Sequence, residues 1–328
     1  YPVSAEIARM WKKALKAIPN SEEFKGWYDT FTFDGKTPEP GQMICMPKLA
    51  DALEKIADTN TDALYYGELA DRIDEESKRF GGFLRKQDLE DHVVEWVEPI
   101  HVDYHGYQVW ELPPNGQGIV ALMALNILNN FQFKNRDVDC IHTQMEALKM
   151  AFADAKEYVT DPKYMNMSVD DLIRVDYGKQ RASQIGHLAM PPRVDKPHGS
   201  GTVYLCTADK DGNMVSYIQS NYMGFGSGIV VDGVSLQNRG YDFSLDPSHV
   251  NYLMPHKKTY HTIIPGFLTK DDKPVGPFGV MGGYMQPQGH MQVISNMIDF
   301  HLNPQMALDA KRFQWMENMK FIVEPGFD

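Results

Sequence analysis

The chain has 328 residues, 43% of them hydrophobic, and a formal net charge of −12 at pH 7. This length and composition predict a globular protein with a large core, built as one large α/β domain or as two smaller ones. Lys and Arg do not cluster beyond pairs, which excludes a nucleic-acid partner. No apolar run approaches the roughly 20 residues of a membrane helix, so no membrane partner is expected. Small-molecule or peptide chemistry is the remaining class.

Cysteine usage and the start of the chain bear on its compartment. The three cysteines are widely spaced and odd in number, which fits neither a disulfide framework nor paired metal ligands, so we expect buried thiols at Cys45, Cys140 and Cys206. No signal peptide is visible, but the chain opens at Tyr1 without methionine, and we expect its natural N-terminus to lie further upstream. A cytoplasmic location is favoured, with periplasmic and secreted locations left open.

The first part of the chain, residues 1–201, is mostly helical by its pattern. Apolar residues recur at helical spacing, and Pro or Gly marks several of the ends, which predicts helices over residues 5–18, 47–57, 61–80, 119–129 and 138–158. Between residues 97 and 112 the pattern changes to alternation around Gly106, which predicts a hairpin.

The second part, residues 202–328, is rich in predicted strands and closely spaced turns until a helix resumes over residues 286–300. Its first strand begins at Thr202, directly after the Gly/Ser-rich segment His198–Gly201, and ends in an Asp-Gly turn. The return strand ends at Ser220, so we expect Ser220 to lie near Thr202.

The position of Thr202 also allows it to act as a nucleophile. A hydroxyl is a poor nucleophile without a neighbouring base, and the α-amine of an N-terminal threonine is such a base, with an unperturbed pKa of roughly 8. A cut between Gly201 and Thr202 would create that amine. The alternative is a loop that leads into a hairpin with an ordinary strand threonine.

Other segments supply the remaining parts of such a site. Gly282 and Gly283 follow a strand-like run and precede a helix, where backbone N–H groups can face a developing oxyanion. Polar groups at turns are found in residues 238–243 and 260–265. They could hold the acyl portion of a substrate.

Motifs over nearly the whole chain carry a family resemblance. In the first part they are Asp62–Gly67, Trp96–Pro99, Tyr104–Tyr107 and Pro113–Gly118. Beyond Thr202 they are Val215–Gly228, Asp242–Phe243, Gly282–Gly283 and Ile298–Phe313. In this order, these motifs resemble the gamma-glutamyltranspeptidase family of N-terminal nucleophile hydrolases.

The resemblance implies roles for individual residues. Thr202 matches the threonine at which the precursor cuts itself and which then serves as nucleophile, and Ser220 matches the hydroxyl residue that steadies it. Gly282 and Gly283 match the oxyanion-hole pair. Asp242 matches the acid that receives the α-amino group of the substrate. No cofactor and no metal are implied.

The resemblance also implies an α+β fold, a four-layer αββα sandwich. A large-subunit-like part, residues 1–201, and a small-subunit-like part, residues 202–328, would come from one precursor and form one catalytic domain. Assembly into a homo-oligomer is left open. A segment before Tyr1 and a tail after Asp328 would be absent here, including the arginine that grips the glutamyl carboxylate.

Several positions depart from the family pattern around the substrate. A serine pair is matched by His261 and Thr262, a glutamine by Arg239, and the substrate-contacting asparagine aligns with Tyr222, so that Asn221 fits only after a shift of one residue. The connection over residues 243–260 is too short for a lid. These features indicate a divergent branch of the kind often labelled cephalosporin acylase.

Three functions follow. The first is an autoprocessing γ-glutamyl hydrolase or transferase that acts on glutathione-like amides, with Asp242 on the α-ammonium and with Arg239 or His261 on the carboxylate. The second is an acylase for glutaryl or cephalosporin-type amides. The third is a non-catalytic homologue that only binds a ligand.

Overall fold

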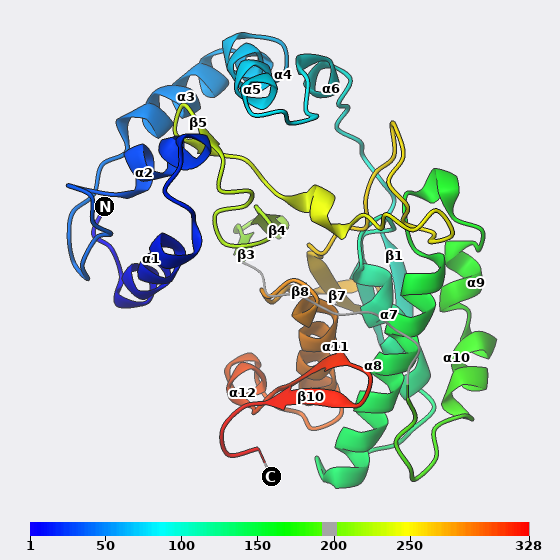
Figure 1. The fold of residues 1–328 in the computed structure, drawn as a ribbon. Helices are drawn as coiled ribbons and strands as arrows, with labels where there is room; N and C mark the ends of the chain where they lie inside the picture. Colours follow the sequence, from blue (N-terminus) through cyan, green and yellow to red (C-terminus); the bar gives the residue numbers. More distant parts are fainter. Residues whose placement is uncertain (192–201, 328) are drawn as a thin grey trace. The chain divides into compact units, whose positions relative to one another are not determined.

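The computed structural model describes residues 1–191 and 202–327. By its internal packing the chain divides into two units, unit 1 (Tyr1–Trp96 and Asn221–Asn238) and unit 2 (Val97–Ser220 and Arg239–Asp328). Figure 1 labels many of the helices and strands of both. The predicted segment His198–Gly201 lies outside the described residues, and the division predicted at residue 202 stays a prediction.

Unit 1 consists of short helices around an aromatic core. The rings of Trp27, Phe31 and Phe225 pack on one another, with centroids 4.6 Å apart for Phe31 and Phe225. Ser4 caps the first helix by accepting a hydrogen bond from the backbone N–H of Ile7. The elements are α1 (Ala5–Ala17), η1 (Glu22–Phe24), α2 (Lys25–Phe31), α3 (Pro47–Asp58), α4 (Asp62–Tyr65), α5 (Glu68–Arg79), α6 (Lys86–Glu90), β5 (Val230–Val231) and β6 (Val234–Ser235).

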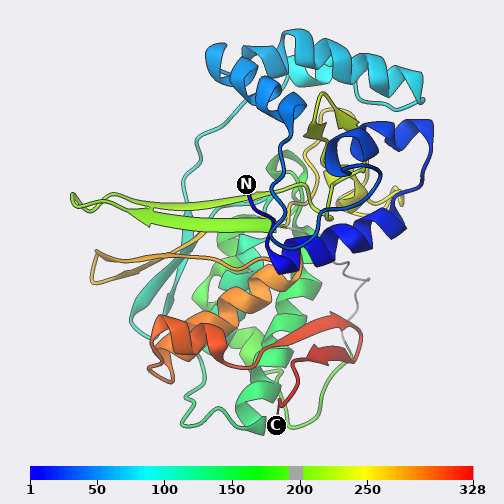
Figure 2. The same ribbon diagram turned by 90° about the vertical axis from the view of Figure 1, so that its left-hand side faces the viewer.

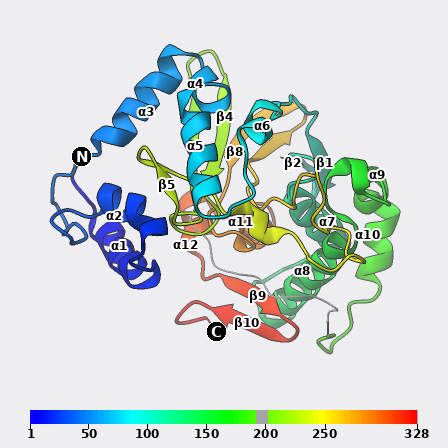
Figure 3. The ribbon, with the colours of Figure 1, turned by 45° about the horizontal axis from the view of Figure 1, so that its top comes forward.

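The helix predicted over residues 61–80 is wrong in one respect, because it is broken into α4 and α5. The backbone N–H groups of Tyr66 and Gly67 both donate to the carbonyl of Asp62 at 2.9 Å, which ends α4 after one turn. Figure 3 shows α4 as a short turn at one end of α5. Both pieces carry an apolar face, so their periodicity does not reveal the break.

The main sheet of unit 2 has four antiparallel strands in the order β1-β2-β7-β8. The predicted hairpin around Gly106 is confirmed as β1 and β2, and Val109 of β2 lies opposite Leu268 of β7, with both side chains in the core. The strands are β1 (Ile100–Tyr104), β2 (Tyr107–Glu111), β7 (Gly266–Lys270) and β8 (Lys273–Phe278).

Helix α7 is the centre of unit 2. All its residues are buried, because it is packed against α8, α10, α11 and the strands β1 and β2, which explains a sequence that is apolar on every face. The predicted helix over residues 138–158 is confirmed, and Asp137 caps it. The helices are α7 (Gly118–Leu128), α8 (Val138–Tyr158), η2 (Pro162–Tyr164), α9 (Val169–Ile173), α10 (Val175–Ala182), η3 (Arg239–Asp242), α11 (Met285–Ile298) and α12 (Pro304–Asp309).

Two further ribbons complete unit 2: β3 (Thr202–Ala208) with β4 (Met214–Ser220), and β9 (Phe313–Glu317) with β10 (Lys320–Val323). In Figure 2 the β3–β4 hairpin runs beside the β7–β8 hairpin. A hydrogen bond of 2.9 Å from Ser216 Oγ to the carbonyl of Gly266 joins them. Within residues 1–191 and 202–327, no helix combines the length and apolarity of a membrane span.

The expectation of three buried thiols is confirmed only for Cys140. Burial raises the pKa of this thiol to about 12. Cys45 and Cys206 are exposed. Cys206 lies on β3, where residues on both faces of the strand are exposed, so an apolar strand sequence does not predict burial there.

Candidate active site

Thr202 and Ser220 form the first part of the site. They are the first residue of β3 and the last residue of β4, and the register of the hairpin places them directly opposite each other. Thr202 Oγ1 donates a hydrogen bond to Ser220 Oγ at 3.0 Å. The predicted proximity is therefore confirmed, and the threonine hydroxyl is held in one direction.

The turn between the strands determines this pairing. Asp209 accepts hydrogen bonds from the backbone N–H groups of Asp211 and Asn213, both at 2.9 Å, and Gly212 has φ 87°. The Asp-Gly pair thus closes a defined turn, and the ladder runs from Ala208 and Met214 to Thr202 and Ser220 without a bulge.

The loop of Gly282 and Gly283 lies directly before α11. Both glycines have positive φ, 127° and 57°, and a Cβ on Gly282 would lie 2.9 Å from Cβ of Met285. The Gly282 carbonyl accepts from the Met285 N–H at 3.0 Å. Because a trans peptide directs its N–H opposite to its C=O, the Gly283 N–H points away from the start of α11. The predicted role of this N–H in an oxyanion hole stays a prediction.

Gln117 is a residue of this site that our sequence reasoning missed. Its side chain is fully buried, and its amide nitrogen donates to the carbonyls of Thr262 and Gly283, both at 2.7 Å. Gln117 therefore joins the predicted oxyanion loop to the predicted substrate segment. The turn-rich sequence around it gives no sign of partners so distant along the chain.

Arg239, Asp242 and Thr262 are brought together by the 3₁₀ helix η3. Arg239 Nη1 lies 3.5 Å from Asp242 Oδ2 and donates to Thr262 Oγ1 at 2.5 Å. The two charged side chains are only 5% and 3% exposed. Removal of one partner would leave a buried charge without compensation, so the pair is structurally coupled.

His261 is held as a neutral imidazole. Burial, and then the positive charge of Arg239, lower its pKa from 6.5 to about 3. Its Nδ1 accepts from the Ile263 N–H at 3.3 Å, which assigns the ring proton to Nε2. His261 therefore offers no positive charge near neutral pH, and its predicted contact with the substrate carboxylate stays a prediction.

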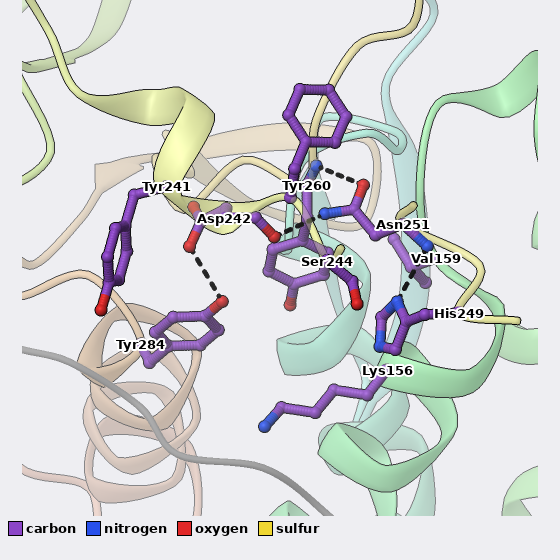
Figure 4. Close-up of a pocket in the computed structure, with 10 residues that line it drawn as sticks. Lys156, Val159, Tyr241, Asp242, Ser244, His249, Asn251, Tyr260 and Tyr284 are labelled. Atoms are coloured by element: carbon purple, nitrogen blue, oxygen red, sulfur yellow. Dashed lines mark hydrogen bonds between the residues drawn. The ribbon is translucent and has the colours of Figure 1, made fainter. Parts of the chain in front are cut away.

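A cavity of about 340 Å³ is lined by Asp242, which among the predicted site residues is the one that its described lining includes (Figure 4). Tyr284, the residue after Gly283, donates from its hydroxyl to Asp242 Oδ1 at 3.2 Å. Tyr284 thus links the glycine loop to the predicted substrate acid and is a second residue that sequence reasoning missed. The lining is Lys156, Val159, Tyr241, Asp242, Phe243, Ser244, His249, Asn251, Tyr260 and Tyr284.

Asn221 and Tyr222 belong to unit 1. Tyr222 is fully buried with φ 76°, and the Asn221 carbonyl accepts from the Asn238 N–H at 3.2 Å. Their predicted contact with substrate stays a prediction.

The described residues include an oriented hydroxyl at Thr202, a glycine loop before α11 and a polar cavity, which are parts that acyl transfer requires. Their assembly into one catalytic site stays a prediction. Among the described residues, no group of three or more His, Cys, Asp or Glu side chains could hold a metal ion.

Comparison with known proteins gives a consistent result. The sequence model of the gamma-glutamyltranspeptidase family matches residues 1–328. The glutathione hydrolase-like YwrD proenzyme of Bacillus subtilis is 39% identical over 320 residues, which cover 96% of this chain and 60% of that protein. The glutathione hydrolase proenzyme of Escherichia coli is 32% identical over 337 residues, which cover 95% of this chain and 57% of that protein.

Solved structures agree. The cephalosporin acylase from Bacillus halodurans is 53% identical, with a TM-score of 0.95 over 100% of this chain and 62% of its own. The gamma-glutamyltranspeptidase of Helicobacter pylori has a TM-score of 0.53 at 26% identity, over 57% of this chain and 54% of its own. The predicted α+β class of the N-terminal nucleophile hydrolases is confirmed. The chain spans about three fifths of the length of these relatives.

Proposed function

The chain belongs to the gamma-glutamyltranspeptidase family, whose members hydrolyse or transfer γ-glutamyl compounds, and we propose that Thr202 is its nucleophile. The Gly201–Thr202 bond of the precursor is cut by the protein itself, which yields a large and a small subunit. The names of relatives as proenzymes support this maturation.

The reaction proceeds through an acyl-enzyme. Thr202 Oγ attacks the amide carbonyl while its own α-amine takes the hydroxyl proton, and the N–H groups of Gly282 and Gly283 bind the oxyanion. The amine returns the proton to the leaving nitrogen, the C–N bond breaks, and an ester to Thr202 remains. Water or an acceptor amine then releases the acyl group.

The hydrogen bond of 3.0 Å between Thr202 Oγ1 and Ser220 Oγ carries this proposal. It joins Thr202, which follows the Gly/Ser segment, to Ser220, the hydroxyl residue that the resemblance assigns as its neighbour.

The first candidate substrate is a small-molecule or peptide γ-glutamyl amide such as glutathione. The second candidate is an amide with another acyl group, as in an acylase. The ion pair of Arg239 with Asp242 favours this second class, because it engages the acid expected to bind the α-ammonium.

The test is maturation of the full-length precursor. We expect the purified protein to give two bands on a denaturing gel, with one fragment beginning at Thr202. Thr202→Val removes the hydroxyl at nearly constant shape and should remain uncut, whereas Thr202→Ser keeps the hydroxyl and should be cut. A fragment that forms equally in Thr202→Val contradicts the assignment, and a wild type that stays uncut favours a non-catalytic homologue.

A further inference from the structure

Asp242 faces a positive charge before any substrate arrives. Its Oδ2 lies 3.5 Å from Arg239 Nη1, and both side chains are nearly inaccessible to water. The other oxygen, Oδ1, accepts the hydroxyl of Tyr284 at 3.2 Å. The acid and the base that were expected to bind opposite ends of a zwitterion are therefore paired with each other.

The cavity is reached by only one member of this pair. Asp242 is among its described lining residues and Arg239 is not. Figure 4 shows the Asp242 carboxylate and the Tyr284 hydroxyl facing each other at the cavity wall. Since Arg239 also donates to the buried Thr262, it is held against the carboxylate from within the protein.

This geometry weakens the attraction of the cavity for a cation. An ammonium beside Asp242 would be attracted by the carboxylate and repelled by the guanidinium a few ångströms further away. In a poorly solvated site the two effects are of comparable size, because water screens neither charge well.

We propose that Arg239 determines the acyl specificity of this site. By compensating Asp242, it admits acyl groups without an α-ammonium, such as the monoamides of dicarboxylic acids, about as well as γ-glutamyl groups. The inference rests on the proposed function, because it needs an acyl-enzyme at Thr202. Arg239 acts through Asp242 and is a positioning residue.

The experiment compares kcat/KM of the processed enzyme for γ-glutamyl and glutaryl anilides, which differ in the α-ammonium. The specificity ratio is kcat/KM for the γ-glutamyl anilide divided by kcat/KM for the glutaryl anilide, and in the wild type it should lie within about tenfold of unity. Arg239→Gln leaves Asp242 uncompensated and should raise this ratio about tenfold or more. Arg239→Lys keeps the charge and serves as the control, with a ratio within about threefold of wild type. A wild-type preference for γ-glutamyl above about 100-fold, or a ratio that Arg239→Gln does not change, overturns the proposal.

A second variant tests the proposal even if Arg239→Gln does not fold. The double variant Arg239→Gln with Asp242→Asn removes both charges and leaves no buried ion. Its ratio should match that of the wild type within about threefold, and a fall of about tenfold in γ-glutamyl preference would show that Asp242 binds the ammonium despite Arg239.

Failure of the proposed function is recognised separately. Fragments on a gel and the burst of anilide product report the cut and the acyl-enzyme without reference to the ratio. Absence of both in the wild type refutes the role of Thr202. Their presence with a ratio insensitive to Arg239 refutes only the specificity role.

Discussion

Gln117 and Gly283 are 166 positions apart in the sequence and are joined by a hydrogen bond of 2.7 Å. The same amide nitrogen donates to the carbonyl of Thr262 at 2.7 Å. One buried side chain therefore holds two loops of the candidate site at a defined separation, and neither loop belongs to a strand or helix at these points.

Replacement of Gln117 by methionine keeps the length of the side chain and removes both donations. The Thr262 carbonyl loses its donor, which costs about 1–3 kcal/mol, whereas the Gly283 carbonyl still accepts from the Gln286 N–H at 3.0 Å. We expect a lower Tm and a fall in kcat with little change in KM, because the glycine loop loses its support. Calorimetry and steady-state kinetics measure both. Gln305→Met, on the exposed surface, should change stability by no more than about 0.5 kcal/mol.

Loss of the Ser220 hydroxyl should slow both the cut and the turnover. Ser220→Ala removes the acceptor of Thr202 Oγ1, and a hydrogen bond worth about 1 kcal/mol corresponds to a fall in rate of roughly fivefold to tenfold. Ser220→Thr keeps the hydroxyl at the end of β4 and should stay close to wild type. Time courses of fragment formation test this, and equal rates for Ser220→Ala and wild type would remove Ser220 from the mechanism.

A side chain at Gly282 should be poorly tolerated. Its φ of 127° is rare for an L-residue, and an added Cβ would approach Met285 to 2.9 Å. We expect Gly282→Ala to cost about 1–3 kcal/mol of stability, and to lower kcat on the order of 100-fold if it displaces an oxyanion donor. Gly186→Ala is the control, since no atom lies within 4 Å of its Cβ position. Normal turnover in a processed Gly282→Ala enzyme would contradict the oxyanion assignment.

His261 should make the fold sensitive to acid. In the folded state its pKa is lowered to about 3, whereas the unfolded chain has the ordinary value of 6.5. Between these values the unfolded state binds more protons, so the stability that this histidine contributes is present above pH 6.5 and is lost as the pH falls toward 3, by up to about 1.4 kcal/mol per pH unit.

The free energy of unfolding is measured from about pH 4 to about pH 7, a range that covers most of the interval between the two pKa values. His261→Asn retains an acceptor for the Ile263 N–H and should flatten the slope. His256→Asn, at an exposed position with φ 56° that asparagine tolerates, should leave it unchanged. An equal slope in His261→Asn and wild type would show that the imidazole is protonated without penalty.

Local patterns predict much of the fold but little of the site. The helix over residues 138–158 is predicted correctly because apolar residues recur at helical spacing along its length. The pairing of Thr202 with Ser220 follows from turn chemistry and strand length, which are also local. The break at Gly67 is not predicted, because a one-turn interruption between two amphipathic helices hardly alters the period.

The missed contacts fall into two kinds. Those of Gln117 depend on which distant loops the fold brings to it, and no residue pattern near it carries that information. The pair of Arg239 and Asp242 is different, because opposite charges three residues apart on one turn can meet. The sequence-based prediction assigned Arg239 and Asp242 to opposite ends of a substrate, although this spacing also allows them to pair with each other.

The β3–β4 hairpin restricts how its length can change in related proteins. Side chains alternate between the two faces of a strand, so one extra residue in β3 alone would put another residue opposite Ser220 and turn the Thr202 side chain to the other face. A residue added to each strand leaves the terminal pair intact. Length variation at this hairpin should therefore occur in matched pairs, with the tip free to move outward while the two hydroxyls stay together.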